Sequence, residues 1–206
     1  MKVLLLNGSP HEYGCTRTAL GLCAEELEKS GIETEIYWLG TEPIGGCTAC
    51  GACRKTGGCV NEKVREFTEK ARQADGFLFG SPVHYAGLSG SVTAFLDRVF
   101  FSAGPDVFRL KPGSAVLSAR RGGTTAAYDQ MNKYFGISQM PIVSSRYWNM
   151  VHGSKPEDVL KDEEGCQIMR MLGRNMAYFL HCREAADKAG ILPPENEKGV
   201  MTNFIR

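Results

Sequence analysis

Four cysteines in the segment CTACGACRKTGGC, residues 47–59, have a spacing that suits metal chemistry. Cys47, Cys50, Cys53 and Cys59 read C-x2-C-x2-C-x5-C, and the overlapping pairs let a tight loop turn three thiolates toward one centre, as in the bacterial ferredoxin run. Zinc sites more often use two separated pairs of Cys or His ligands. The spacing therefore favours a [4Fe-4S] cluster over zinc, and free thiols in an ordinary loop are the alternative interpretation.

A second candidate site lies in NGSPHEYGCTRTAL, which begins at residue 7. A strand that ends in Gly-Ser-Pro before a helix rich in small hydroxyl residues offers the Ser9 and Thr16 hydroxyls, and free N–H groups, to a phosphate. The segment has neither the lysine of a Walker loop nor a G-x-G-x-x-G run, so it indicates neither an NTPase nor a dinucleotide site. A plain strand-to-helix turn with a capped helix is the alternative interpretation.

Two further loops carry groups that suit a flat ring ligand. In GSPVHYAGLSGSVTAFLDR, residues 80–98, an apolar strand opens into Gly-Ser-Pro followed by His84 and Tyr85. In SARRGGTT, residues 118–125, glycines permit close backbone approach, while Arg120 and Arg121 supply positive charge and N–H donors. Surface ion pairing is the alternative role for either arginine.

The hydrophobic pattern predicts the elements that must bring these loops together. Short apolar runs predict strands, and apolar residues at i, i+3, i+4 and i+7 predict helices between them. The predicted strands are 2–7, 34–39, 76–81, 113–119 and 141–145, and the predicted helices include 20–27, 62–74, 92–100, 125–135 and a long final helix. Strict alternation predicts an α/β fold with a five-stranded parallel sheet in the flavodoxin-like order 2-1-3-4-5. Ligands then bind at the carboxyl ends of the strands, where the three loops begin.

Composition limits the class of partner. The 206 residues include 24 Lys and Arg against 23 Asp and Glu, so no global field attracts nucleic acid or an anionic membrane. The apolar start KVLLL ends at NGSP, which is too short for a signal peptide or a membrane span. We therefore expect a cytoplasmic protein, in which disulfides are rare, with one domain over residues 1–192 and a C-terminal tail over 193–206.

The segments LLLNGSPHEYGCTRTAL, GFLFGSPVHYAGLSGSVTAFLDR and SARRGGTT resemble the NADPH-dependent FMN reductase family of flavodoxin-like flavoproteins, over residues 1 to about 155. The resemblance implies a three-layer α/β/α sandwich that binds FMN. It places the phosphate among Ser9, His11, Cys15 and Thr16, the ribityl chain and ring at Pro82, Val83, His84 and Tyr85, and the pyrimidine edge at Ala119, Arg120, Arg121, Gly122 and Gly123.

The first loop departs from the family pattern at two positions. An arginine or lysine is common in the family at the position of His11, and an asparagine or serine at that of Cys15. Neutral side chains there supply less to a dianionic phosphate, so FMN affinity would either be lower than is typical of the family or rest more on backbone N–H groups and Arg17.

The resemblance implies an FMN-dependent NAD(P)H oxidoreductase that passes electrons to a small acceptor such as a quinone, a flavin or a nitro compound. The cysteine run also resembles that of iron–sulfur flavoproteins, which implies the alternative: a [4Fe-4S] cluster that exchanges electrons with FMN and a ferredoxin-like partner. A flavodoxin-type electron carrier is a third hypothesis, which the near-neutral charge balance disfavours. We expect a homodimer or homotetramer, because one flavin face needs a cover.

Overall fold

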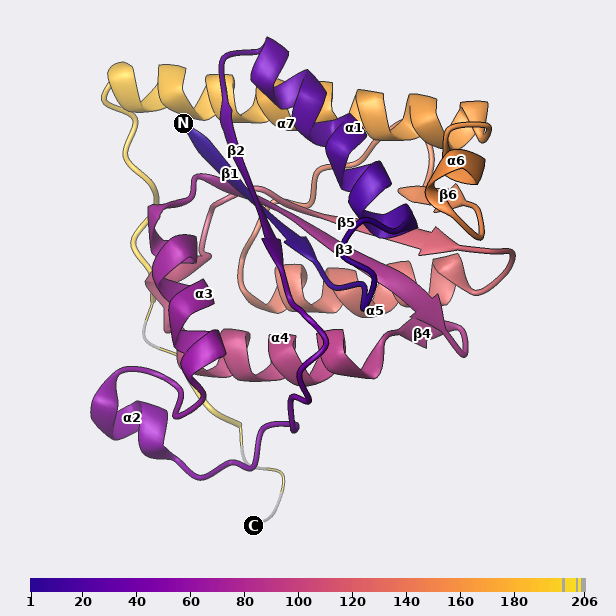
Figure 1. The fold of residues 1–206 in the computed structure, drawn as a ribbon. Coiled ribbons are helices and arrows are strands. Elements are labelled where there is room, and N and C mark those ends of the chain that lie inside the picture. The colour runs from indigo at the N-terminus through magenta and orange to yellow at the C-terminus, as the bar shows by residue number, and fades with distance from the viewer. Residues whose placement is uncertain (198, 203, 205–206) are drawn as a thin grey trace.

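The structure, a computed structural model, describes residues 1–197, 199–202 and 204. Short apolar segments form a parallel sheet of order β2-β1-β3-β5-β6 (Figure 1). These strands are β1 (Lys2–Asn7), β2 (Glu33–Trp38), β3 (Gly76–His84), β5 (Gly113–Ala119) and β6 (Met150–His152). The flavodoxin-like order 2-1-3-4-5 is therefore confirmed for the parallel strands. The sheet differs from the prediction by β4 (Gly87–Leu88), which pairs antiparallel with the end of β3.

Helices cover both faces of the sheet and make three layers. Figure 1 shows α1 and α7 on one face, with α3, α4 and α5 on the other. The longer helices are α1 (Cys15–Lys29), α3 (Glu62–Gln73), α4 (Gly90–Ser102), α5 (Thr124–Ile137) and α7 (Glu163–Lys188); the short ones are α2 (Ala52–Thr56), α6 (Pro156–Val159) and the 3-10 turn η1 (Pro105–Val107). The α/β/α sandwich predicted from the sequence is confirmed.

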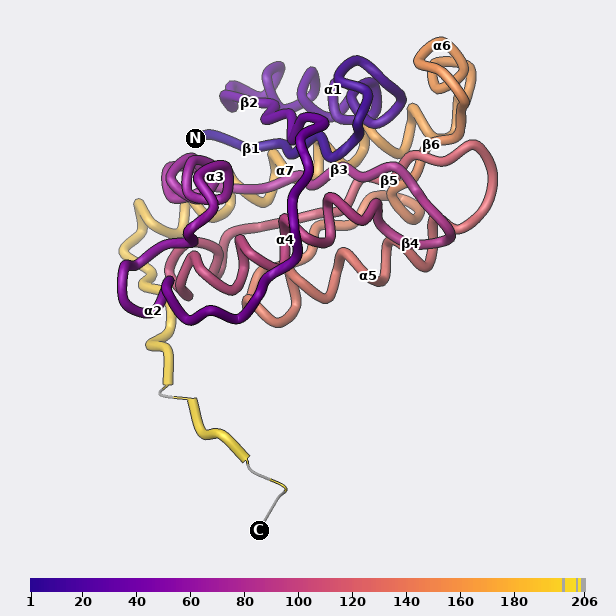
Figure 2. Tube along the Cα trace, turned by 60° about the horizontal axis from the view of Figure 1, so that its bottom comes forward, coloured from indigo at the N-terminus to yellow at the C-terminus, as the bar shows by residue number. Residues whose placement is uncertain are grey.

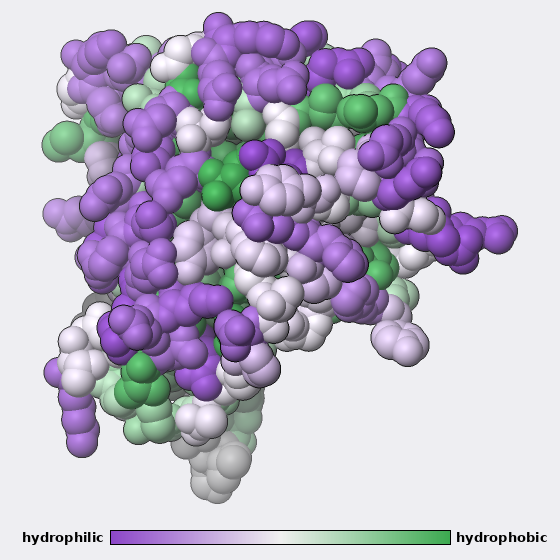
Figure 3. Space-filling view, in the orientation of Figure 1, coloured by the Kyte–Doolittle hydropathy of each residue, from purple (hydrophilic) through white to green (hydrophobic). Residues whose placement is uncertain are grey.

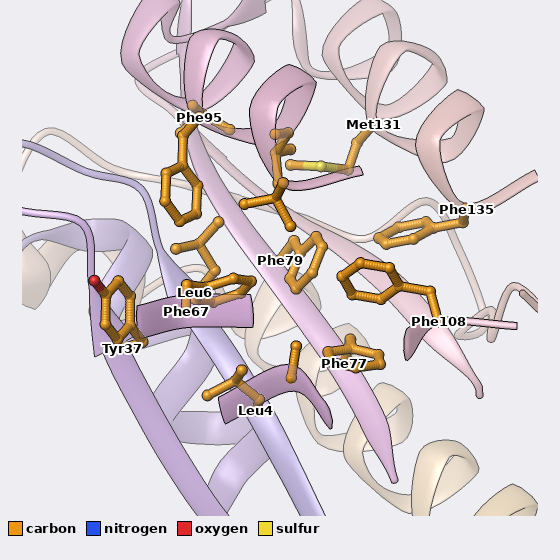
Figure 4. Packing of buried hydrophobic residues seen from close by; sticks show 14 of the residues in the cluster. Leu4, Leu6, Tyr37, Phe67, Phe77, Phe79, Phe95, Phe108, Met131 and Phe135 are labelled. Carbon is orange, nitrogen blue, oxygen red and sulfur yellow. The ribbon is translucent and has the colours of Figure 1, made fainter. Parts of the chain in front are cut away.

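The core explains the unbroken apolar run Val3–Leu6 of the central strand β1. Because successive strand residues point to opposite faces, Leu4 and Leu6 pack with the α3, α4 and α5 side, while Val3 and Leu5 pack with the α1 and α7 side. Figure 4 shows the first of these layers, in which the Phe67, Phe79 and Phe95 rings gather. Burial on both faces fixes the sheet and hence the loops at its edge.

The prediction that the fifth strand occupies residues 141–145 is wrong. Ile142 forms a single bridge with Gly113, and the strand beside β5 is β6, with Leu117 opposite Met150. Two hydrogen bonds at Ser114 explain the detour. Its hydroxyl donates to the Val143 carbonyl at 2.6 Å and accepts from Asn149 Nδ2 at 2.8 Å, so the chain leaves the sheet after Val143 and returns at Asn149.

The surface and the end of the chain add two observations. The face in Figure 3 is largely hydrophilic, and no helix of the described residues is both long and apolar enough to cross a membrane. After α7 the residues that the structure describes form no helix or strand, and Arg109 Nη2 donates to the Pro194 carbonyl at 2.7 Å. Residues 198, 203, 205 and 206 of the predicted tail lie outside the described residues.

Candidate functional site

The loop after β1 is shaped by the side chain of Asn7, which ends that strand. Asn7 Oδ1 accepts from the Ser9 N–H at 3.2 Å, and its Nδ2 donates to the Glu12 carbonyl at 2.8 Å. Ser9 Oγ accepts in turn from the His11 N–H at 3.1 Å. Gly14 then precedes α1 without a capping side chain, so the N–H groups of the first turn stay available to an anion.

A close approach between α1 and β3 fixes where that helix begins. A Cβ atom at Gly80 would lie 2.7 Å from Thr16 Cγ2 and 2.8 Å from Leu20 Cδ1. Only glycine fits this position, which lets the start of α1 rest directly on the sheet. Thr16 is then within hydrogen-bond distance of the fourth parallel strand, with 2.8 Å between its Oγ1 and Ser118 Oγ.

These elements enclose a cavity of about 810 Å³ at the carboxyl edge of the sheet. Eight of the predicted flavin-site residues line it: Ser9, His11, Cys15, Thr16, Pro82, Val83, Ala119 and Arg120. They come from the loops after β1, β3 and β5, as the topology requires. The sequence thus predicted residues that the fold brings together from three separate segments.

Five predicted residues lie outside the cavity lining: His84, Tyr85, Arg121, Gly122 and Gly123. His84 and Tyr85 are exposed on the β3–β4 hairpin, where Tyr85 and Ala86 both have positive φ values, 49° and 59°. A Cβ atom at Gly123 would lie 2.7 Å from Ala86 Cα. The loop after β5 therefore packs directly on this hairpin. These five residues follow the lining residues Val83 and Arg120 in the sequence, and we call them the rim.

Sequence reasoning missed two parts of the lining. Gly153, Ser154, Lys155 and Pro156 follow β6, and they were missed because the fifth strand had been placed too early. Trp38, the last residue of β2, also lines the cavity, and its Nε1 donates to the Ser9 carbonyl at 2.9 Å. The available signal for Trp38 was an aromatic residue at the carboxyl end of a predicted strand.

The charged and titratable groups around the cavity are few. Arg120 and Lys155 are its cations and Glu12 is its carboxylate. Cys15 Sγ donates to the Gly153 carbonyl at 3.6 Å, and burial raises the pKa of this thiol, so Cys15 is neutral at physiological pH. The first loop thus offers an anion mainly backbone N–H groups and neutral side chains.

The cavity fits FMN by size and by donor type. Its volume falls in the range of small-molecule sites, roughly 300–1,000 Å³. An uncapped helix start suits a phosphate, and the Pro82, Val83 and Ala119 side of the cavity offers apolar contact to a ring. The residues that would hold FMN are therefore those of the loops after β1, β3, β5 and β6.

The four cysteines of the second candidate site line one small cavity of about 20 Å³ between the cysteine segment and α4. Cys47 and Cys50 are exposed, Cys53 is half-buried in α2, and Cys59 is buried. Ala49, Gly51 and Gly57 have positive φ, so the segment is tightly coiled. The four cysteines thus belong to the lining of one pocket.

The donor set fits an iron–sulfur cluster, although the cysteines are not gathered to bonding distance. Four thiols with no carboxylate or histidine in the lining are the ligand chemistry of such a cluster. Within residues 1–197, 199–202 and 204, no three His, Cys, Asp or Glu side chains are close enough together to hold a metal ion. The cavity has room for about one water molecule, so the coiled segment would have to widen to admit the group.

Known proteins with similar sequences identify the family of this chain. A family model for NADPH-dependent FMN reductases matches residues 1–155. An iron–sulfur flavoprotein of Methanocaldococcus jannaschii is 33% identical over 189 residues, which span 86% of this chain and 96% of that protein. An FMN reductase (NADPH) of Escherichia coli is 29% identical over 126 residues, 61% of this chain and 59% of that one.

Solved structures agree at the level of the fold. A flavodoxin from the domain Archaea superposes with a TM-score of 0.60 at 13% identity, covering 88% of this chain and 99% of its own. The flavodoxin-like fold, the strand-end cavity and the family match over residues 1–155 point the same way. This chain belongs to the NADPH-dependent FMN reductase family.

Proposed function

We propose that this protein is an FMN-dependent oxidoreductase that takes electrons from NAD(P)H and passes them to a small acceptor such as a quinone, a flavin or a nitro compound. The observation that carries the proposal is the cavity of about 810 Å³ built from strand-end loops, in a chain of the FMN reductase family. The NADPH named for the similar Escherichia coli protein supports the choice of reductant. Bound FMN would supply the hydride and electron chemistry.

The protein's own residues would bind and orient the ring system. Backbone N–H groups at the start of α1 would hold the phosphate, while Pro82 and Val83 would pack against the ring. Arg120, exposed beside Ala119, would place positive charge near the pyrimidine edge, where it favours an anionic reduced flavin. His84 and Tyr85, on the rim, would face the incoming nicotinamide or acceptor.

A second candidate function, electron exchange between a [4Fe-4S] cluster, FMN and a ferredoxin-like partner, is favoured by two specific observations. Cys47, Cys50, Cys53 and Cys59 line one pocket, and the 33% identical relative is named an iron–sulfur flavoprotein. The cysteines would be the cluster ligands, and such free thiols suit the reducing cytoplasm that we propose as the location of this chain.

An absorption spectrum of protein purified without oxygen, followed by addition of NADPH, tests these proposals. A flavin spectrum bleached by NADPH would support the oxidoreductase, and a broad brown absorbance with bound iron and sulfide would support the cluster. A flavin spectrum that NADPH leaves unchanged would exclude NADPH as the donor. Absence of any flavin, even after incubation with FMN, would refute both proposals.

A further inference from the structure

Arg98 joins the helical core to the cysteine segment. It lies on α4, whose Phe95, Leu96 and Val99 are fully buried, so the backbone that carries Arg98 is held in place. Its guanidinium reaches out of the core. Nε donates to the Gly45 carbonyl at 2.6 Å, Nη2 to the Gly46 carbonyl at 2.8 Å, and Nη1 to Cys59 Sγ at 3.6 Å.

These three bonds hold both ends of the cysteine segment. Gly45 and Gly46 directly precede Cys47, and Cys59 is the last of the four cysteines. One planar side chain therefore closes the loop that carries all four thiols, with each of its three nitrogens on a different acceptor. Lysine could not reproduce this, because its ammonium is a single point of charge.

Arg65 supplies a natural comparison at the same loop. From α3 its Nη1 donates to the carbonyls of Cys59 and Val60, at 2.9 and 3.0 Å. It brings a positive charge and two hydrogen bonds to the segment, but these hydrogen bonds go to carbonyl oxygens and not to sulfur. Arg65 and Arg98 thus differ mainly in the contact with Cys59 Sγ and in the closure of the loop.

Arg98 places one positive charge in the lining of the cysteine cavity. Arg98 is the charged residue of the lining, which otherwise consists of the four cysteines and neutral side chains or backbone. A partly buried guanidinium among sulfur atoms gains most when those atoms carry negative charge. In iron–sulfur proteins, hydrogen bonds to sulfur and local charge are among the factors that set cluster stability and reduction potential.

We propose that Arg98 is the positioning residue of the four-cysteine site: it closes the loop and donates to Cys59 Sγ, and so stabilises a net-negative cluster held there. This inference rests on the second candidate function above, the iron–sulfur cluster. Removal of the guanidinium would weaken the hold on iron and shift the cluster potential to a more negative value.

The test compares wild-type protein with Arg98→Met, Arg98→Lys and Arg65→Met, all purified without oxygen. Iron and sulfide per chain are measured after challenge with a chelator, the midpoint potential by redox titration, and FMN per chain as the control for folding. We expect Arg98→Met to lose iron affinity about tenfold while it keeps FMN, Arg98→Lys to be intermediate, and Arg65→Met to resemble wild type. Equal iron loss in Arg98→Met and Arg65→Met, or none in either, would overturn the inference.

A second measurement keeps the inference testable if wild-type protein binds no iron, a result that would refute the cluster itself. The alkylation rate of Cys59 is then followed by mass spectrometry in iron-free protein. Cys59 is only 9% exposed, so its modification requires the loop to open. We expect much faster modification in Arg98→Met than in Arg65→Met, and equal rates would show that Arg98 does not close the loop.

Discussion

The indole of Trp38 links β2 to the loop that follows β1. Trp38 ends β2, lines the flavin cavity and donates from Nε1 to the Ser9 carbonyl. Ser9 Oγ in turn accepts from the His11 N–H. The orientation of the backbone around Ser9 therefore depends partly on a residue that lies far away in the sequence.

Replacement of Trp38 by Phe keeps an aromatic ring but removes this hydrogen bond. A single hydrogen bond contributes about 1 kcal/mol, so we expect FMN to bind about fivefold more weakly. Riboflavin, which lacks the phosphate, should lose much less affinity. Fluorescence titration of both ligands measures the two changes, and Tyr13→Phe, which alters another aromatic residue of the same cavity, is the control. Equal losses for FMN and riboflavin would refute the role in phosphate binding.

Individual site residues could be predicted from the sequence where a strand-end motif specified them. Ser9, Pro82 and Ala119 line the cavity because each sits at the carboxyl end of a correctly predicted strand or just after it, and Thr16 lines it from the first turn of the helix that follows β1. Trp38 was missed because no loop motif surrounds it. Arg98 was missed because its role depends on a contact between α4 and a segment that is more than 35 residues earlier.

At the scale of elements, the fifth strand shows how tertiary contacts override a local pattern. The apolar run PIVSS predicted a strand, but the hydrogen bonds of Ser114 with Val143 and Asn149 place the return of the chain at residue 149. Neither contact can be read from the sequence, since both join residues about 30 positions apart. Because the fifth strand was placed too early, the loop Gly153–Pro156 was left out of the predicted site. The expectation that the ligand site lies at the carboxyl ends of the strands was itself correct for this cavity.

The β3–β4 hairpin is an element in a costly conformation. Tyr85 and Ala86 have positive φ, which costs non-glycine residues roughly 1–2 kcal/mol each. The double variant Tyr85→Asn, Ala86→Gly should therefore raise the free energy of unfolding by about 1 kcal/mol, measured by urea denaturation of flavin-free protein. Tyr85→Asn alone, which keeps Ala86, should gain less. A lower stability in the double variant would mean that the side chains contribute more than the strain costs.

Helices α1 and α7 are joined by a buried carboxylate. Glu26 accepts from Arg174 Nε at 2.6 Å and from Lys29 Nζ at 2.7 Å, and these two partners hold the pKa of Glu26 below its usual range. A carboxylate with a lowered folded-state pKa stabilises the protein above its unfolded-state pKa, and this stabilisation is lost as the pH falls through the folded-state pKa.

Glu26→Gln should accordingly destabilise the protein by about 1 kcal/mol at neutral pH. The difference from wild type should shrink as the pH falls below the ordinary glutamate pKa, about 4.3, because the unfolded chain then takes up a proton at Glu26. It should vanish only below the lowered folded-state pKa, where the folded carboxylate is also neutral. Denaturation at a series of pH values measures this, with Glu25→Gln, an exposed neighbour on α1, as the control. A difference that is constant with pH would show that the ion pair is not its cause.

At the scale of the whole molecule, the two candidate sites are separate. The flavin cavity and the cysteine cavity share no lining residue, and α2 and α6 lie on opposite sides of the molecule in Figures 1 and 2. A cluster held by the cysteines of one chain would therefore not touch the flavin cavity of the same chain. Direct electron exchange between the two sites would require a second copy or a partner protein.

We expect that second copy to cover the aromatic surface between α5 and β6. Tyr147 and Trp148 are 52% and 50% exposed, their ring centroids are 4.9 Å apart, and Ile142, five residues before Tyr147, is also exposed. Exposed aromatic pairs are typical of interfaces. This segment leads into β6 and then into the loop Gly153–Pro156, which lines the cavity proposed to bind FMN and is called the flavin loop below.

The variant Tyr147→Ser, Trp148→Ser should therefore shift the protein from dimer or tetramer toward monomer, which analytical ultracentrifugation measures as a lower mass. Val60→Ser is the control, because Val60 is 60% exposed but lies beside α2, away from this segment. The double variant should also bind FMN more weakly if the second copy covers the flavin loop. If Val60→Ser dissociates the oligomer and the double variant does not, the copies instead meet through the cysteine side, and the aromatic surface is free.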